Sequence, residues 1–175
     1  KPSDFDDDGC RIIPKKAVQF GGKIILNEDH TYCRNNFAED NLSHIVDSRY
    51  VISTLRDLVP SGPSIGLVGV IEEEGEFMLA QGVYGFLLNE NLDNHYFAQI
   101  SNTDWYRALM YKIMVGSTQV HIRSSEFLQI NLPVPPLPKQ KEIVLTLTTL
   151  DRRIIKEKKY LSKVINLKKS LLNNL

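Results

Sequence analysis

The sequence predicts an α+β fold, in which a body with a mixed or largely antiparallel sheet is followed by one long C-terminal coiled-coil helix. Short segments rich in β-branched and aromatic residues fill the first half of the chain. Helical spacing of apolar residues begins only near Asn94, and a second, longer helical pattern occupies the last 37 residues, 139–175. Strands and helices do not alternate regularly, so a parallel α/β sheet is not expected.

The strands are predicted from short apolar runs that turn residues separate. "RIIPKKAVQF" and "GGKIIL" read as extended segments with a turn at Gly21 and Gly22. "YVIST" (50–54) has the β-branched and aromatic composition of a half-buried strand, and the prolines and glycines of "LVPSGPSIG" (58–66) predict a loop after it. Further strands are predicted in "LVGVI", "EFMLA" and "VYGFLL".

Helices are predicted in the second half of the body, between Asn94 and Gly116. Apolar and aromatic residues recur there at three, four or five positions: Tyr96, Phe97, Ile100, Trp105, Leu109 and Ile113. One more short helical turn is expected in "SSEFLQI". Four prolines then follow in a short stretch, Pro133, Pro135, Pro136 and Pro138.

The tail contains neither glycine nor proline after Pro138, and its apolar residues alternate at spacings of four and three. A helix of roughly 37 residues would be about 55 Å long. A small body cannot cover such a length, so most of the stripe is expected to pair with another helix, from a second copy or from elsewhere in a longer chain. A surface helix folded back on its own domain is the alternative. The predicted seam comprises Ile143, Leu147, Leu150, Ile154, Leu161, Val164, Leu171 and Leu175, with Glu157 and Lys168 at its two polar positions.

The net charge of zero is the sum of two parts with opposite charges. Residues 1–138 contain 11 Lys and Arg against 18 Asp and Glu, a net charge of minus seven, whereas residues 139–175 contain 10 against 3, a net charge of plus seven. A length of 175 residues allows one ordinary domain with an appendage. The predicted organisation is therefore a body at 1–138 and a helical arm at 139–175.

Composition favours an intracellular protein that does not enter a membrane. With 42% hydrophobic and 24% charged residues, the chain has no apolar run of about 18 residues. Its first ten residues are acidic, where a secretory signal would be basic and then apolar. Cys10 and Cys33 are too few for a disulfide scaffold, which favours a reducing, cytoplasmic compartment.

The segment "INLPVPPLPKQKEIVLTLTTLDRRI" (130–154) resembles the junction in specificity subunits of type I restriction-modification enzymes. There an aliphatic strand, a Leu-Pro-Pro-Leu-Pro segment and a glutamine precede a long helix. Gln140 stands at the glutamine position, although Lys139 replaces the usual glutamate. Three stretches, "YVISTLRDLVPSGPSIGLV" (50–68), "LAQGVYGFLL" (79–88) and "GSTQVHI" (116–122), resemble other parts of the family, and the resemblance is weakest before residue 45.

This resemblance implies a target recognition domain followed by one helical arm. In that family two such domains each read half of a split DNA sequence, and two long helices pair as an antiparallel coiled coil that sets the distance between them. Proline restricts its own φ and the preceding residue, so the segment Pro133, Pro135, Pro136, Pro138 and Gln140 is interpreted as a stiff hinge. The single domain and arm depart from the full-length pattern, and leave three interpretations open: a fragment, a half-sized subunit that dimerises, or a standalone relative.

The implied partners are double-stranded DNA, modification (methyltransferase) subunits and a restriction or motor subunit, together with a second recognition unit or second copy paired through the helix. The family places S-adenosylmethionine on the modification subunits, so this chain is expected to bind no cofactor and to have no catalytic residues. "VPPL" lacks the acidic or asparagine residue and the aromatic residue that flank prolines in aminomethyltransferases. No metal site is expected either, because His30 and Cys33 lack nearby partners and the runs "DFDDDG" and "EEEGE" are typical of solvated loops.

Candidate DNA contacts are cations and amides in the first third of the chain, because Arg or Lys reads guanine and Asn or Gln reads adenine in the major groove. They are Lys15, Lys16, Gln19, Lys23, Arg34, Asn35, Asn36, Arg49 and Arg56. The resemblance adds Gln119 and His121, and Arg107, Lys112 and Arg123 are candidate phosphate contacts of lower rank. A body of net charge minus seven should repel phosphate. A coiled-coil interaction or assembly module that does not bind DNA is therefore the alternative function.

Overall fold

The computed structural model describes residues 4–26 and 31–173 of the chain. The chain forms two compact units, Lys1–Pro135 and Pro136–Leu175. The division lies three residues before the predicted boundary at Pro138. The long helix α5 (Leu137–Leu172) includes Pro138 in its first turn, where the missing N–H group would have no partner within the helix.

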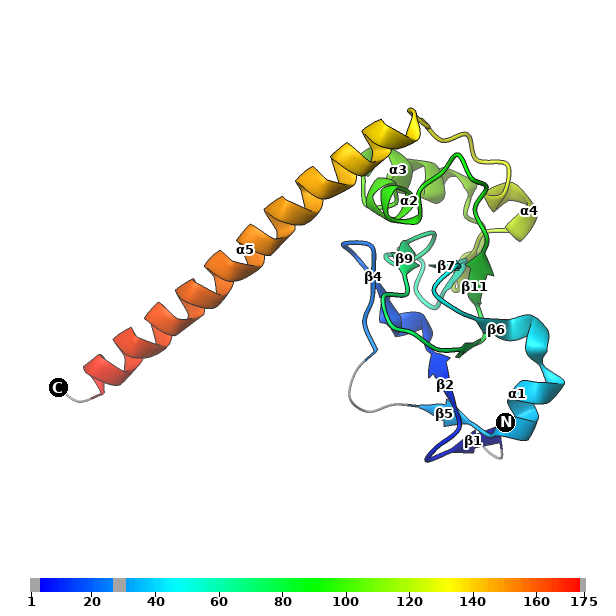
Figure 1. Ribbon diagram of the computed structural model, residues 1–175, viewed down its shortest axis with the longest axis horizontal. Helices are drawn as coiled ribbons and strands as arrows, with labels where there is room; N and C mark the ends of the chain where they lie inside the picture. The colour runs from blue at the N-terminus through cyan, green and yellow to red at the C-terminus, as the bar shows by residue number, and fades with distance from the viewer. Residues whose placement is uncertain (1–3, 27–30, 174–175) are drawn as a thin grey trace. The chain divides into compact units, whose positions relative to one another are not determined.

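Among its described residues, the first unit contains two five-stranded sheets and one two-stranded ribbon. Figure 1 shows where most strands of the two larger sheets lie. The strand order of the first sheet is β1 (Phe5–Asp6), β5 (Tyr32–Cys33), β2 (Cys10–Ile13), β10 (Phe77–Leu79) and β6 (Ile45–Val46). Among its described strands, β2 and β10 are the only pair that is parallel. In the second sheet β9 and β4 pair in parallel, and its order is β11 (Val83–Phe86), β7 (Val51–Thr54), β9 (Val68–Val70), β4 (Lys23–Ile24) and β3 (Val18–Gln19).

The ribbon pairs β8 (Arg56–Asp57) with β12 (Val120–His121). The three sheets and the long helix confirm the predicted α+β fold with mixed and antiparallel pairing. One predicted extended segment is interrupted, because residues Lys15–Ala17 form a 3₁₀ turn after Pro14. The turn at Gly21 and Gly22 is confirmed, since both residues have positive φ angles of 93° and 74° that favour glycine.

The predicted helical region between Asn94 and Gly116 is two helices, α2 (Asn94–Ile100) and α3 (Asp104–Ile113). Each begins with a side-chain cap. The Asp93 carboxylate accepts a hydrogen bond from Tyr96 N at 2.9 Å at the start of α2, and Thr103 Oγ1 accepts one from Tyr106 N at 3.3 Å at the start of α3, which separates the two helices. The remaining helical segments of the body are α1 (Asn35–Asp40), a 3₁₀ turn at Leu42–His44 and α4 (Ser124–Phe127). Neither α1 nor the turn after it was predicted.

Apolar side chains from both sheets form the main core, which includes Ile13, Ile52, Leu67, Phe77 and Val83. A smaller cluster joins the first sheet to α1 through Ile12, Cys33, Ala38 and Met78. Aromatic contacts tie α2, α3 and α4 together, with the Phe97 ring centroid 6.2 Å from Tyr106 and 6.5 Å from Phe127. The body is therefore packed from residues far apart in sequence.

The segment 129–136 adopts no strand, although the resemblance implied an aliphatic strand before the helix. Proline has no N–H group to donate to a sheet, and three of these eight residues are Pro133, Pro135 and Pro136. The Tyr96 hydroxyl donates a hydrogen bond to the Pro133 carbonyl at 3.0 Å, which attaches the segment to α2.

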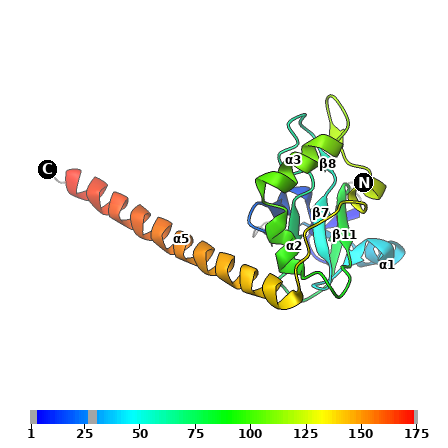
Figure 2. The ribbon, with the colours of Figure 1, turned by 90° about the horizontal axis from the view of Figure 1, so that it is seen from above.

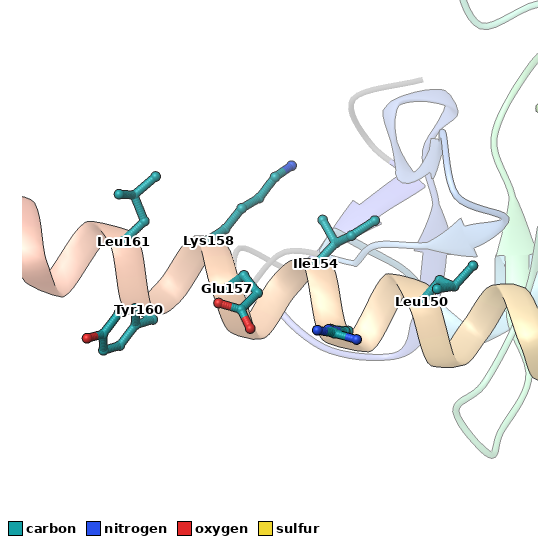
Figure 3. Close-up of a pocket in the computed structure, with 7 residues that line it drawn as sticks. Leu150, Ile154, Glu157, Lys158, Tyr160 and Leu161 are labelled. Atoms are coloured by element: carbon teal, nitrogen blue, oxygen red, sulfur yellow. The ribbon is translucent and has the colours of Figure 1, made fainter.

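Helix α5 has 36 residues and carries the predicted apolar seam on an exposed surface. Leu150, Ile154 and Leu161 are 51%, 50% and 58% exposed. Figure 3 shows these three side chains projecting to the same side of the helix, while Tyr160 points away from them. The last predicted seam residue, Leu175, lies outside the described residues. Within the described part of the chain, no helix combines the length and hydrophobicity that crossing a membrane requires.

Candidate nucleic-acid interface

The β8–β12 ribbon brings two of the predicted DNA contacts together. Arg56 and His121 are directly opposite each other in the antiparallel register, as are Asp57 and Val120. Side chains alternate between the two faces of a strand, so each pair occupies one face. Arg56 and His121 are exposed, whereas Asp57 and Val120 are 5% and 1% exposed. The ribbon therefore has one buried face and one polar face open to solvent.

The loop before β12 extends this polar face. Gly116, Ser117, Thr118 and Gln119 are all exposed, and two hydrogen bonds of 2.9 Å between Val115 and His121 close the loop. Gly116 has a φ angle of 120°, and a Cβ atom there would lie 2.1 Å from the Gln119 carbonyl oxygen. The loop conformation thus requires glycine. Figure 2 shows this yellow-green loop projecting from the body beside β8. We call Arg56, Ser117, Thr118, Gln119 and His121 the ribbon surface.

A buried carboxylate supports the ribbon from its other face. Asp57 accepts hydrogen bonds from Ser64 N at 3.0 Å and Ser64 Oγ at 2.7 Å, from Leu58 N at 2.8 Å and from Lys15 Nζ at 3.1 Å. Burial alone would raise the pKa of Asp57, but the hydrogen bonds from Ser64 and Lys15 outweigh it and lower this pKa below its ordinary value. Lys15, which was predicted as a DNA contact, is thus bound to the buried Asp57 that supports the ribbon.

Helix α3 holds the loop 58–66 that follows β8. The Arg107 guanidinium donates hydrogen bonds to the carbonyls of Ile65 at 2.6 Å, Pro63 at 3.1 Å and Gly62 at 3.3 Å. Tyr106, which is fully buried, donates its hydroxyl proton to the Gly66 carbonyl at 2.9 Å. Arg107 is 7% exposed, so its interpretation as a candidate phosphate contact is wrong: its charge is used inside the protein, on carbonyl oxygens.

A second group of predicted contacts lies on the β3–β4 edge of the second sheet. Gln19 and Lys23 are opposite each other, and Lys16 is close because its carbonyl accepts a hydrogen bond from the Gln19 side-chain amide at 3.2 Å. The turn between these strands is packed against α2: Gly21 N donates to the Asn102 side chain at 2.8 Å, and a Cβ at Gly22 would lie 2.8 Å from the Ala98 Cβ. The side chains of Lys16, Gln19 and Lys23 are exposed, whereas the turn at Gly21 and Gly22 is fixed to the body.

The remaining predicted contacts lie elsewhere. Arg34, Asn35 and Asn36 begin α1, which Figure 1 shows well apart from β4. Arg34 pairs with Asp6 at 3.4 Å, and Arg49, before β7, binds Asp47 through its Nη2 at 2.7 Å. Arg56, by contrast, forms no ion pair within the described part of the chain. The predicted residues therefore form separate groups and not one continuous patch.

Sequence reasoning did not select Ser117 and Thr118, although "GSTQ" was part of the stretch that resembled the family. Their position directly after Gly116, in a run of consecutive polar residues, was the available signal, because glycine followed by polar residues is typical of a loop. The scaffold of Asp57 and Ser64 was not predictable, since the six residues between them fold back only in the tertiary structure.

Among residues 4–26 and 31–173, no group of three His, Cys, Asp or Glu side chains could hold a metal ion. His30, which was weighed as a zinc ligand, lies outside the described residues. Cys10 and Cys33 are free thiols on opposing positions of β2 and β5. Burial and the neighbouring Cys33 raise the pKa of Cys10.

A family model described as the type I restriction modification DNA specificity domain matches residues 5–166, which include most of both units. The chain therefore belongs to this family, and the resemblance found in its sequence is confirmed.

Two relatives illustrate the match. Over 175 residues the chain is 24% identical to the type I restriction enzyme MjaVIII specificity subunit of Methanocaldococcus jannaschii, covering 99% of this chain and 40% of that protein. The crystal structure of the HsdS subunit from Thermoanaerobacter tengcongensis shares the fold, with a TM-score of 0.59 and 14% identity over 89% of this chain and 34% of that one. The chain thus spans less than half the length of either relative.

Proposed function

We propose that this chain is a non-catalytic DNA-recognition module of a type I restriction-modification enzyme. Its body reads one half-site of a bipartite DNA target, and helix α5 pairs with a second helix of the same kind to set the distance between half-sites. The family match over residues 5–166 is the observation that carries this proposal, because it includes both the body and most of the helix.

The exposed seam of α5 supports the pairing role. Apolar residues spaced by four and three positions form the seam of a coiled coil, and each buries its side chain only when a second helix lies against it. Leu161 and Leu171 are 58% and 61% exposed in the single chain. A second copy, or a second recognition unit in a longer chain, would supply that helix.

Docking of partner subunits completes the proposed function. Modification subunits would bind the module, supply S-adenosylmethionine and carry out methyl transfer, and a restriction or motor subunit would join the same assembly. Pro133, Pro135, Pro136, Pro138 and Gln140 would set the direction in which the arm leaves the body, which a fixed half-site distance requires.

Selection of bound duplexes from a random DNA pool tests this function. The purified chain is used alone and with a modification subunit added. Enrichment of one short motif, or of two copies at a fixed distance, is the expected result. If neither condition enriches any motif, DNA recognition by this chain is ruled out.

A protein-interaction module that does not bind DNA is the second candidate, and the net charge of minus seven over residues 1–138 favours it. The two functions differ in their response to salt. Lys and Arg contacts to phosphate release counterions, so DNA binding weakens steeply as salt rises, whereas association with a protein through an apolar seam does not.

A further inference from the structure

The ribbon surface differs from the other predicted arginine contacts because its arginine forms no ion pair with a carboxylate within the described residues. Arg56, Ser117, Thr118, Gln119 and His121 all carry hydrogen-bonding groups, and no carboxylate belongs to the set. Arg34 and Arg49 would have to leave Asp6 and Asp47 before they contacted a base, whereas Arg56 has no such partner within the described residues. Because a bound carboxylate competes with a base for the same donors, Arg56 is the better placed of these three arginines.

The shape of the ribbon matches the major groove of DNA. That groove is about 12 Å wide and admits a two-stranded β-ribbon. Neighbouring strands lie about 4.8 Å apart, which leaves room for side chains on both edges. The β3–β4 pair has the same width, but its turn is packed against α2 through Gly21 and Gly22, so it cannot enter a groove by that end. The β8–β12 pair ends in the exposed loop 116–119.

The ribbon is also held in one position before any ligand binds. Ile122 N donates to the Leu55 carbonyl at 2.9 Å, and the buried Asp57 binds Ser64, Leu58 and Lys15 beneath it. Arg107 fixes the adjoining loop at three carbonyls. A binding element that is already ordered loses less conformational entropy when it binds, which strengthens discrimination between similar sequences.

We propose that the β8–β12 ribbon, with its loop 116–119, is the base-reading element of this module and enters the major groove of the duplex. Arg56 donates two hydrogen bonds to O6 and N7 of a guanine, and Gln119 reads an adjacent adenine through N6 and N7. The inference rests on the proposed function, since it assigns the recognition of DNA to particular residues.

The test compares three forms of the full chain in the random-pool selection, each with the modification subunit added: the unchanged protein, Arg56→Gln, and Arg34→Gln, which tests the competing candidate at the start of α1. Arg56 is exposed and unpaired within the described residues, so the substitution should leave the fold intact, which circular dichroism and thermal unfolding verify. For Arg56→Gln we expect a motif that has lost guanine at one position and a roughly 10- to 100-fold weaker affinity for the original motif. Arg34→Gln should enrich the original motif.

Three results would overturn the inference. An unchanged motif with folded Arg56→Gln would remove the ribbon from base reading while leaving DNA recognition by the chain intact. A motif changed by Arg34→Gln and not by Arg56→Gln would move base reading to the α1 side of the body. Failure of the unchanged protein to enrich any motif would overturn the proposed function itself, and the ribbon assignment with it.

Discussion

At the scale of single residues, buried polar groups have the clearest consequences in this protein. Asp57 accepts hydrogen bonds from four donor groups of three residues, and Arg107 donates hydrogen bonds to three carbonyl oxygens of one loop. A buried charge is costly unless hydrogen bonds compensate it, so each of these side chains specifies a local conformation and tolerates little change. Arg107 is compensated through its two terminal nitrogens, while its Nε has no hydrogen-bond partner among the described residues. Both fix the segment 56–66 that supports the ribbon surface.

Replacement of Asp57 by asparagine should destabilise the protein in a pH-dependent way. The pKa of Asp57 is lowered in the folded state, so the carboxylate stabilises the fold above its unfolded pKa of about 3.9 and loses this contribution as the pH falls through its folded value. At pH 7 we expect Asp57→Asn to lower the free energy of unfolding by about 2 kcal/mol, because an amide leaves some of the four donors unsatisfied.

Urea denaturation of both proteins at pH 7 and at several values below pH 4 checks this expectation. The difference between the two midpoints should shrink as the pH is lowered. A difference that stays constant across the whole range would show that the Asp57 charge does not stabilise the fold.

At the scale of elements, glycine and proline positions determine the loop 116–119 and the length of helix α5. Gly116 closes the loop before β12 in a conformation with φ of 120°, which other residues rarely adopt. Helix α5 continues for 36 residues because neither glycine nor proline interrupts it after Pro138. The loop presents the ribbon surface, and the helix presents the seam.

Gly116→Ala should distort the loop 116–119 and weaken sequence-specific DNA binding. The added Cβ would lie 2.1 Å from the Gln119 carbonyl oxygen, so the loop must shift and carry Gln119 with it. Gly75→Ala is the matched control, because Gly75 has a similar φ of 123° but open space around it. We expect a loss of affinity of roughly 10-fold or more for the selected motif with Gly116→Ala only, measured by fluorescence anisotropy. Equal losses of affinity in both variants would show that backbone strain, and not a shift of the loop 116–119, weakens DNA binding.

Replacement of Leu150 and Leu161 by lysine should convert a dimer to a monomer. Two like-charged side chains at seam positions cannot be buried against a second helix, while both residues are exposed in the single chain and their loss leaves the body unchanged. Light scattering gives the mass in solution, and circular dichroism reports the fold. An unchanged mass would exclude pairing through this seam. Replacement of the exposed pair Lys156 and Lys159, which lie outside the seam, by glutamine serves as a control for altered charge on the helix.

At the scale of the whole molecule, the chain combines an acidic body with a basic helix. Their charges of minus seven and plus seven cancel, so long-range attraction to DNA is weak and binding must depend on local contacts. Two recognition units joined through paired helices would bind two half-sites at once, and the second contact would then form at a high effective concentration.

A duplex with two half-sites should therefore bind the paired protein only at particular spacings. Insertion of five base pairs between the half-sites turns one of them by about half a helical turn, so a stiff pair of arms cannot reach both. We expect affinity to fall roughly 100-fold relative to the selected spacing, toward that of a single half-site. Gel-shift titration over a series of spacers measures this dependence, and affinity that is independent of spacing would contradict the ruler role of α5.

The sequence by itself determined the α+β class, most strands of the body, the helical region after Asn94, the long C-terminal helix and the family. These depend on local properties: β-branched runs, proline and glycine positions, and a spacing of four and three that needs no knowledge of distant residues. The tertiary structure decided which predicted contacts meet. Arg56 and His121 are 65 positions apart in the chain and face each other only because β8 pairs with β12. It also turned Arg107 inward and divided the remaining cations into separate groups, because strand pairing and burial depend on contacts that no single stretch of sequence contains.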